Sequence, residues 1–469
     1  MRIFPTAYID PGTGSMLFTV VIGVAGALWY FLKDQFIKLK SVFTGGKAVV
    51  QDREKIPFLI FSDSKRYYNV FGPLCEECEK RGIEVQYWTM SEDDPVFSAS
   101  FLHVHPEYIG NGSAAFARLN RMKAGLCLST TPGLDVLQWK RSKDTDCYIH
   151  IFHDVTEGTG YRMFGMDYYD EVLLTGEFQA AYIRKMEEMR GLPQKKLTVT
   201  GSPYMDALAA RLARETAEEA GDPALSQEGG AARPPVPTIL LAPSWGASSI
   251  LNKYGEAFLS ALADTGYRIV VRPHPQSATS DPELLARLRS RFPESERFSW
   301  NFDNDHFEAL KNADLMITDF SGVMFDYALV FDRALLYADV QMDTAPYDAA
   351  WFEEENWRLR ILPELGKKLD PADFGRMKDL IDEVLSDDRY AEGRRRLREI
   401  CWQKRGRSAC ETVDYLETVL AKQAAAKADA AAEQNAAAEK EADAEVSETA
   451  AGDGGKGAAP REDRKEAAK

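Results

Sequence analysis

Groups that can bind phosphate follow three apolar runs of the chain, at the points where strands are predicted to end. The runs lead into APSW at 242–245, RPHP at 272–275 and TDFSG at 318–322, and the last segment precedes a helical pattern. An arginine can neutralise a phosphate, and the free backbone N–H groups of a helix start bind anions. Each segment alone fits an ordinary strand–turn–helix connection, but together they predict a pyrophosphate site. The residues expected to bind it are Arg272, Ser244, Trp245, Thr318, Asp319, Ser321 and Gly322.

Two histidines at strand ends are candidates for catalysis. His153 follows an alternating run at 148–152, and His274 lies between the two prolines of the RPHP segment. A neutral imidazole changes its charge close to working pH, so His153 could act as a general base on a hydroxyl. The alternative is a surface histidine without a role. His150, inside the run, is expected to face the core or the sheet. A shared site requires His153 and His274 to face each other across one cleft.

The chain around these residues alternates between short apolar runs and longer amphipathic stretches. This alternation predicts an α/β fold with two parallel, doubly wound, Rossmann-like sheets, which bind ligands at the carboxyl ends of their strands. An Ala-, Gly- and Pro-rich stretch at 215–237 is expected to link a first domain, 49–214, to a second domain, 238–420. The predicted strands are 56–61, 83–88, 125–128, 148–152, 171–174 and 197–199, followed by 238–241, 268–271, 315–317 and 334–337.

The two ends of the chain depart from this pattern. Residues 1–48 contain an uncharged apolar run at 15–32 that is followed by lysines. This predicts a single-pass transmembrane helix in the cytoplasmic membrane, with the catalytic domains on the cytoplasmic side. A cleaved signal peptide or a buried core helix fits the length and the flanks less well. Residues 421–469 contain no aromatic residue, so we expect a disordered tail, with transient helix in its alanine runs.

Composition and missing motifs argue against several classes of protein. The formal net charge of −16 disfavours nucleic acid as the main partner. No P-loop motif and no G-x-G-x-x-G opens a helix, which disfavours a P-loop ATPase and an NAD enzyme. No D-x-D motif suggests a metal-bound donor, so we predict a site without metal or cofactor, in which charged and backbone donors stabilise the phosphates. The six cysteines lack zinc-site spacing and are expected to be reduced, structural thiols.

The same motifs resemble those of the CDP-glycerol glycerophosphotransferase family of teichoic-acid polymerases and primases. The resemblance covers roughly 148–420 and rests on His153 and on the segments at 201–203, 241–245, 272–275 and 318–326. It implies a GT-B fold and transfer of glycerol phosphate from CDP-glycerol to a hydroxyl of a lipid-linked acceptor at the inner face of the membrane. By resemblance, His153 is the base on the acceptor hydroxyl, His274 and Arg272 lie near the donor phosphates, and Asp319 and Ser321 belong to the donor-binding loop.

The sequence departs from the family pattern at two places. HDVT at 153–156 stands where the family usually has His-Gly-Thr, and Gly322 stands where a second serine is common. We predict a membrane-anchored enzyme that moves glycerol phosphate, or a related polyol phosphate, from a CDP-linked donor to a lipid-linked or cell-surface glycan acceptor and releases CMP. The alternatives are a nucleotide-sugar-dependent GT-B glycosyltransferase for surface polysaccharide and a catalytically inactive nucleotide-binding scaffold.

Overall fold

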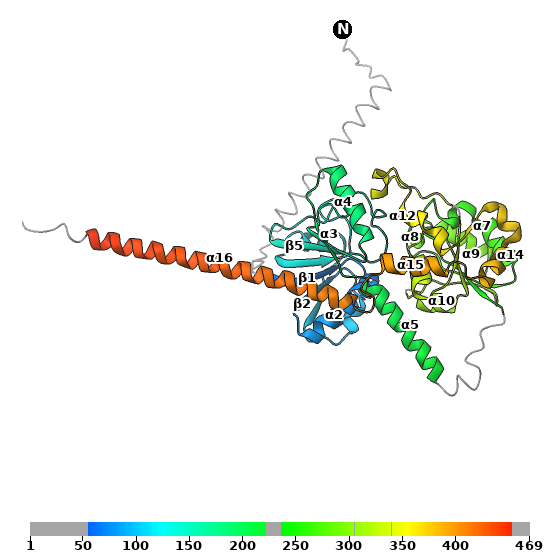
Figure 1. Cartoon of the computed structure of the whole chain (residues 1–469), viewed down its shortest axis with the longest axis horizontal. Helices are drawn as coiled ribbons and strands as arrows, with labels where there is room; N and C mark the ends of the chain where they lie inside the picture. The colour runs from blue at the N-terminus through cyan, green and yellow to red at the C-terminus, as the bar shows by residue number, and fades with distance from the viewer. Residues whose placement is uncertain (1–54, 222–235, 304, 339, 453–469) are drawn as a thin grey trace, which may run out of the picture. The chain divides into compact units, whose positions relative to one another are not determined.

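The computed structural model describes residues 55–221, 236–303, 305–338 and 340–452. The predicted apolar anchor at 15–32 lies outside these ranges, as do residues 222–235 of the predicted linker. Across the described ranges, none of the helices is both long and apolar enough to cross a membrane. The part from residue 55 onward forms one compact unit that contains two lobes, each built on its own sheet (Figure 1).

The first lobe is built on seven parallel strands in the order β3-β2-β1-β4-β5-β6-β7. Because all neighbours are parallel, the loops that follow β1 and β5 open at the same edge of the sheet. Its helices include α2 (Tyr68–Arg81), α3 (Gly112–Leu119) and α4 (Phe178–Arg190). The strands are β1 (Ile56–Ser62), β2 (Val85–Thr89), β3 (Val104–Tyr108), β4 (Ala124–Ser129), β5 (Thr145–Ile151), β6 (Glu171–Leu174) and β7 (Lys196–Val199).

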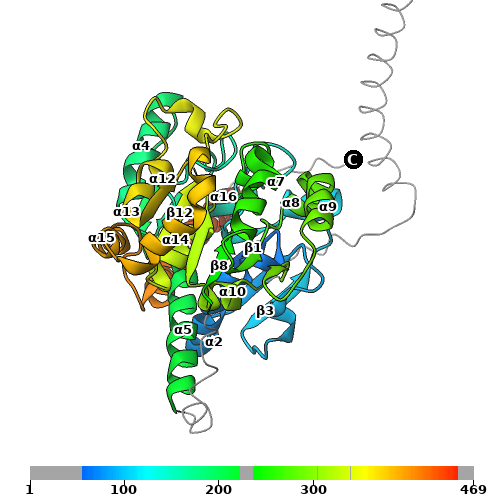
Figure 2. The same ribbon diagram turned by 90° about the vertical axis from the view of Figure 1, so that its right-hand side faces the viewer.

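The second lobe is built on six parallel strands in the order β10-β9-β8-β11-β12-β13. Helices lie on both sides of this sheet (Figure 2). The strands are β8 (Thr238–Leu241), β9 (Arg268–Val271), β10 (Phe298–Trp300), β11 (Leu315–Thr318), β12 (Leu335–Ala338) and β13 (Gly366–Leu369). The main helices are α7 (Ile250–Ala263), α9 (Pro282–Arg291), α10 (Phe307–Asn312), α14 (Met377–Ser386) and α15 (Ala391–Cys401).

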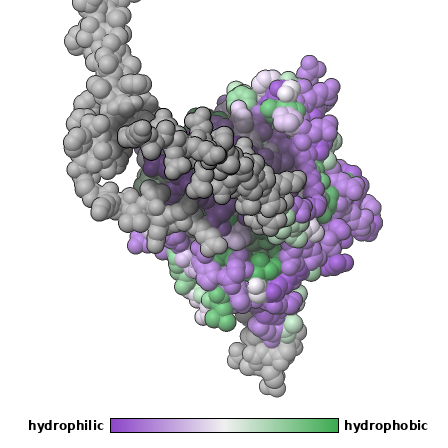
Figure 3. Space-filling view, turned by 90° about the vertical axis from the view of Figure 1, so that its left-hand side faces the viewer, coloured by the Kyte–Doolittle hydropathy of each residue, from purple (hydrophilic) through white to green (hydrophobic). Residues whose placement is uncertain are grey.

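Successive side chains of the second sheet pack into two separate cores. Ile239 and Ile317 belong to a cluster that includes side chains of α7, α9 and α14, whereas Leu240 and Met316 belong to a cluster on the other face. A sheet covered on both faces requires apolar residues at every strand position, which is why these strands are continuous apolar runs in the sequence. The face of the molecule shown in Figure 3 is mainly hydrophilic where grey atoms do not cover it.

The predicted start of the linker at residue 215 is wrong. Helix α5 (Pro203–Gly221) continues through ETAEEAG, a segment of mostly good helix formers that extends the helix from its packed beginning. The first turns of α5 are held against both lobes, because Met205 and Leu208 are part of the core of the second lobe and α5 also contacts α2.

The predicted end of the second domain at residue 420 is also wrong, because the last helix returns to the first lobe. In α16 (Ser408–Gly452), Val413, Leu416 and Val419 join the same core cluster as Phe58 of β1. Figure 1 shows α16 running past the strands of the first lobe.

The tail that was expected to be disordered from residue 421 is helical as far as Gly452. The packed turns at the start of α16 provide the helix nucleus, and alanine, glutamate and lysine extend a helix at little cost once it has begun.

Candidate functional site

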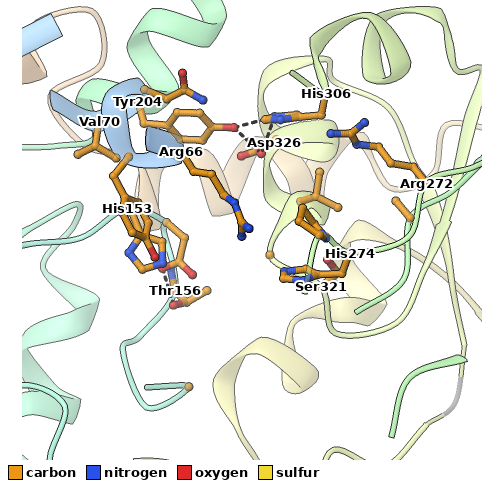
Figure 4. A pocket seen from close by; sticks show the side chains of 18 of the residues that line it. Arg66, Val70, His153, Thr156, Tyr204, Arg272, His274, His306, Ser321 and Asp326 are labelled. Carbon is orange, nitrogen blue, oxygen red and sulfur yellow. Dashed lines mark hydrogen bonds and ion pairs between the residues drawn. The ribbon is translucent and has the colours of Figure 1, made fainter. Parts of the chain in front are cut away.

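A cavity of about 440 Å³ lies between the two lobes, at the carboxyl ends of their strands. In the first lobe, β5 leads to His153 and β1 leads to Arg66; in the second, β9 leads to the segment containing His274. Parallel strands deliver these loops to one place. Figure 4 shows His153 and His274 on opposite walls of the cavity. The structure therefore brings the two candidate histidines into a single cleft, as their proposed roles require.

His153 is held by contacts on its first-lobe side. Its Nδ1 lies 3.0 Å from the hydroxyl oxygen of Thr130. Its ring packs against those of Tyr67 and Tyr161, with centroids 4.9 Å and 5.7 Å away. Among the described residues, the other ring nitrogen, Nε2, has no hydrogen-bond partner. This arrangement fixes the plane of the ring and leaves Nε2 available to a hydroxyl group in the cavity.

A half-buried carboxylate, that of Asp63, lies close to His153. Asp63 follows β1, and its Oδ1 is buried without a hydrogen-bond partner in the described part of the chain. Burial raises the pKa of Asp63, while the neighbouring Thr131 and the charge of His153 lower it. The sequence analysis missed Asp63, because a single aspartate after a strand carries no motif.

His274 is held as a neutral ring with its proton on Nε2. The backbone N–H of Gln276 donates to His274 Nδ1 at 3.1 Å, so Nδ1 carries no proton in this arrangement. Burial, followed by the nearby positive charge of Arg66, lowers the pKa of His274 to about 4. The ring of Trp245 lies beside it, with centroids 6.3 Å apart. His274 is therefore suited to donating a hydrogen bond to a phosphate oxygen rather than to accepting a proton.

Arg272 has a guanidinium fixed by neutral oxygens. One Nη donates to the side-chain oxygen of Asn301, and the other donates to the backbone carbonyl of Asp303 at 2.8 Å. No carboxylate among the described residues forms an ion pair with it. Arg272 therefore presents a positioned positive charge to the cavity that it lines.

Ser321 and Gly322 also line the cavity, at the start of a short helical segment. The segment consists of α11 (Val323–Phe325) and the π-helix η3 (Asp326–Val330). The Ser321 N–H donates to Asp319 Oδ1 at 3.2 Å, so it is already used. The Met324 and Phe325 N–H groups donate to the Ser321 and Gly322 carbonyls at 3.2 Å and 3.1 Å, so in the described part of the chain only the Gly322 and Val323 N–H groups of this turn are left to bind an anion.

Four of the predicted donor-binding residues do not line the cavity: Asp319, Thr318, Ser244 and Trp245. Asp319 is only 1% exposed; its Oδ1 accepts from the Ser244 and Ser321 N–H groups and its Oδ2 from that of Ile250, at 2.8, 3.2 and 3.0 Å. The Thr318 hydroxyl donates to the Ala242 carbonyl at 2.7 Å. Desolvation raises the pKa of Asp319, and the amide donors lower it. In the structure, Asp319 and Thr318 hold these loops from behind, and direct contact of these four residues with a donor stays a prediction.

Tyr204, which the sequence analysis did not select, closes one end of the cavity with two second-lobe residues. Its hydroxyl donates to Asp326 Oδ2 at 2.6 Å and lies 2.8 Å from His306 Nε2 (Figure 4). Burial and the Asp326 charge raise the pKa of Tyr204, so its hydroxyl stays protonated. The preceding GSP turn was the only signal for this position; nothing in the sequence pointed to His306.

Asp154 lies on the first-lobe wall opposite the phosphate loop. Its Oδ1 accepts from the Thr156 N–H and hydroxyl, at 3.3 Å and 2.7 Å. Its Oδ2 is 3.7 Å from Arg358 Nη2, while Arg358 Nη1 donates to the Phe320 carbonyl at 3.1 Å. A methyl group added to Gly322 would come within 3.8 Å of Asp154 Oδ2. The two positions at which the sequence departs from the family pattern therefore face each other across the cleft.

The loop that follows His153 is also attached to the second lobe. Arg162 and Tyr347 form an antiparallel bridge, and the Asp348 and Ala349 N–H groups donate to carbonyls of the first lobe at 2.9 Å and 2.8 Å. The buried Arg190 donates to Asp348 at 2.6 Å and pairs with Asp167 at the same distance. These backbone hydrogen bonds and the ion pair join the first-lobe wall to the second lobe, although Arg190 Nε has no hydrogen-bond partner in the described part of the chain.

Two parallel sheets that share a cleft at the ends of their strands define a fold that resembles GT-B transferases, and solved structures support this class. The wall teichoic acid polymerase TagF, soaked with CDPG, is 16% identical with a TM-score of 0.50, covering 79% of this chain and 90% of that one. The S. aureus MnaA–UDP structure is 12% identical with a TM-score of 0.50, covering 78% and 97%. At these identities the likeness supports the fold alone.

Evidence for a family comes from a comparison of the sequence with family models. A family model described as CDP-glycerol:poly(glycerophosphate) glycerophosphotransferase matches residues 167–350. The match confirms the resemblance predicted above: residues 167–350 are similar to this family of transferases. Arg272, His274 and Ser321 fall inside the matched range, whereas His153 falls before it. No curated protein matches the chain in sequence.

Proposed function

We propose that the protein transfers glycerol phosphate, or a related polyol phosphate, from a CDP-linked donor to an acceptor hydroxyl and releases CMP. The proposal rests on the groups that share one cleft. One wall carries His153, an imidazole with a free ring nitrogen, and the other carries His274, a neutral imidazole, beside the fixed guanidinium of Arg272. The family match supports a CDP-linked donor, and so does the structural likeness to TagF, a wall teichoic acid polymerase that was soaked with CDPG.

In this mechanism His153 acts on the acceptor, and Arg272 and His274 act on the donor phosphates. His153 Nε2 takes the proton of the acceptor hydroxyl, and the oxygen attacks the β-phosphorus of the donor. The bond between that phosphorus and the oxygen bridging to the α-phosphate breaks, and CMP leaves with the electron pair. Arg272 and the His274 Nε2–H stabilise the charge on the phosphate oxygens, together with the helix-start amides near Ser321. The proton on His153 is then released to solvent, which leaves a new phosphodiester and CMP.

A donor screen with product analysis tests the proposed function. The full chain is incubated with an acceptor-containing membrane extract and with CDP-glycerol, CDP-ribitol or a nucleotide sugar, and the released nucleotide is identified. We expect CMP from a CDP-linked polyol. Release of a nucleoside diphosphate from a nucleotide sugar would instead identify a glycosyltransferase of the same fold. Nucleotide binding without release of any product would identify an inactive binding protein.

We further propose that the acceptor is lipid-linked or part of a surface glycan and that residues 15–32 hold the enzyme at the cytoplasmic membrane. The apolar run and the lysines after it support an anchor. We expect the full chain to sediment with membranes and a variant lacking 15–32 to remain in the supernatant with its donor binding unchanged. Equal sedimentation of the two proteins after a high-salt wash would contradict the anchor.

A further inference from the structure

We propose that Arg66, on the first lobe, is a further phosphate ligand that binds the transferred phosphoryl group and distinguishes a nucleoside diphosphate from a monophosphate. The inference deepens the proposed function and depends on it only for the identity of the donor. It concerns a part of the chain, before residue 148, in which the sequence analysis found no motif. Neither the family match nor the resemblance includes this position.

The position of Arg66 is set by the turn that supports His153. It lies in η1 (Lys65–Tyr67), the short 3-10 helix that directly follows β1. The Tyr67 N–H donates to the Ser64 carbonyl at 2.9 Å, and the Tyr67 ring packs on His153. The neighbouring Lys65 N–H donates to the Ser91 hydroxyl at 2.9 Å. Arg66 therefore lies in a turn whose two neighbouring residues are both fixed. One of them, Tyr67, contacts the proposed base His153.

The guanidinium of Arg66 extends into the space between the two histidines. Figure 4 shows it between His153 on one wall and His274 on the other. The proposed reaction takes place between these rings, because the acceptor hydroxyl meets one and the donor phosphates meet the other. A cation at this position is close to the phosphorus that is attacked, where negative charge collects on the equatorial oxygens.

Among the described residues, Arg66 also forms no ion pair, although Asp63 lies near enough for the charge of Arg66 to lower the pKa of that carboxyl. The Arg66 side chain is exposed and forms no hydrogen bond within the described part of the chain. The other cations that line the cavity differ: Lys65 pairs with Asp93, and Arg358 lies 3.7 Å from Asp154. Only Arg272 resembles Arg66, because neutral oxygens hold it. A cation without a partner in a cleft favours binding of an anion.

The two cations without a carboxylate partner match the charge of the proposed donor. Arg66 comes from the first lobe and Arg272 from the second. A nucleoside diphosphate joined to an alcohol carries one negative charge on each of its two phosphates. With one guanidinium available to each phosphate, a diphosphate can use both, whereas a monophosphate such as CMP can use only the one on the nucleotide side. The positive charge of Arg66 also opposes protonation of His274, whose pKa it lowers.

The test compares diphosphate with monophosphate binding by calorimetry on the full chain. We expect Arg66→Ala to weaken CDP-glycerol binding about 10- to 100-fold, the range for loss of a charged hydrogen bond, and to change CMP binding less than about two-fold. Arg66→Lys should recover part of the loss, because lysine keeps the positive charge but lacks the planar, bidentate donor geometry of a guanidinium. Arg121→Ala, an exposed arginine of the same lobe outside the cavity, is the control and should bind both ligands like the parent. Thermal unfolding of each variant verifies that the fold is intact.

The outcomes separate this inference from the proposed function. Equal weakening of CDP-glycerol and CMP, or no weakening of either, would overturn the role of Arg66. If the parent protein binds a UDP-sugar and not CDP-glycerol, the donor assignment fails, and the same ratio measured with the UDP-sugar and UMP decides the role of Arg66. Binding of no nucleotide at all by the parent protein would overturn both.

Discussion

Replacing His153 with alanine is expected to lower the rate of CMP release by about 10²- to 10⁴-fold, the usual contribution of a positioned general base. The affinity for CDP-glycerol should change much less, because His153 acts on the acceptor hydroxyl in the proposed mechanism, whereas the donor phosphates are bound by Arg66, Arg272 and His274. Turnover is measured as CMP release at saturating donor, and affinity is measured by calorimetry. A loss in turnover with affinity preserved is the signature of a group that acts on the acceptor hydroxyl.

His105 provides a matched control for this change. It is an exposed histidine of the same lobe that contacts Glu84 and lies outside the cavity, so His105→Ala should retain the parent rate. Full turnover by the His153→Ala protein would contradict a base at this position. A large loss of donor affinity in that variant would instead place the nucleotide against the first-lobe wall.

The second large effect is expected on stability, from Asp319→Ala. The change removes the acceptor of three backbone N–H groups in the second lobe and leaves them buried without partners. Each such group costs about 1–3 kcal/mol, so for three of them we expect the free energy of unfolding to fall by about 3–9 kcal/mol. Asp319→Asn should cost less, because its oxygen still accepts from Ser244 and Ser321 while its NH₂ faces the Ile250 N–H. The measurement is the midpoint of urea unfolding followed by circular dichroism.

An exposed aspartate of the same lobe serves as the comparison. Asp264 follows α7 on the surface, and Asp264→Ala should shift stability by less than about 0.5 kcal/mol. If Asp319→Ala instead leaves the unfolding midpoint unchanged and abolishes nucleotide binding, Asp319 acts on the donor directly. That result would support the role that the family resemblance implied.

The interior strands of both sheets could be predicted from the sequence, but three edge strands could not. β3, β10 and β13 stand at the ends of their sheets and were all missed. An edge strand pairs on one side only, so it can lack the continuous apolar run of a strand covered on both faces; β7, the fourth edge strand, was predicted, and β10 is only three residues long. β3 reads VHPEY and β13 reads GKKL, and neither has an apolar pattern.

The sequence likewise predicted only part of the candidate site. The sequence by itself determined which groups follow the strands, and for His153, Arg272, His274 and Ser321 that was enough to place them at one cleft, because parallel strands all end at one edge. It could not determine which way a side chain turns after the strand. Asp319 turned inward to three amides, whereas Arg66, without a motif, turned into the cavity.

The contacts between the lobes were decided by the tertiary structure alone. Tyr204 meets Asp326 and His306 about a hundred residues further along the chain, and α16 returns to the first lobe after the whole second lobe has been built. Such contacts depend on how two independently formed sheets pack against each other. No local pattern of apolar or charged residues encodes that arrangement, so only the folded chain reveals which polar groups share the cavity.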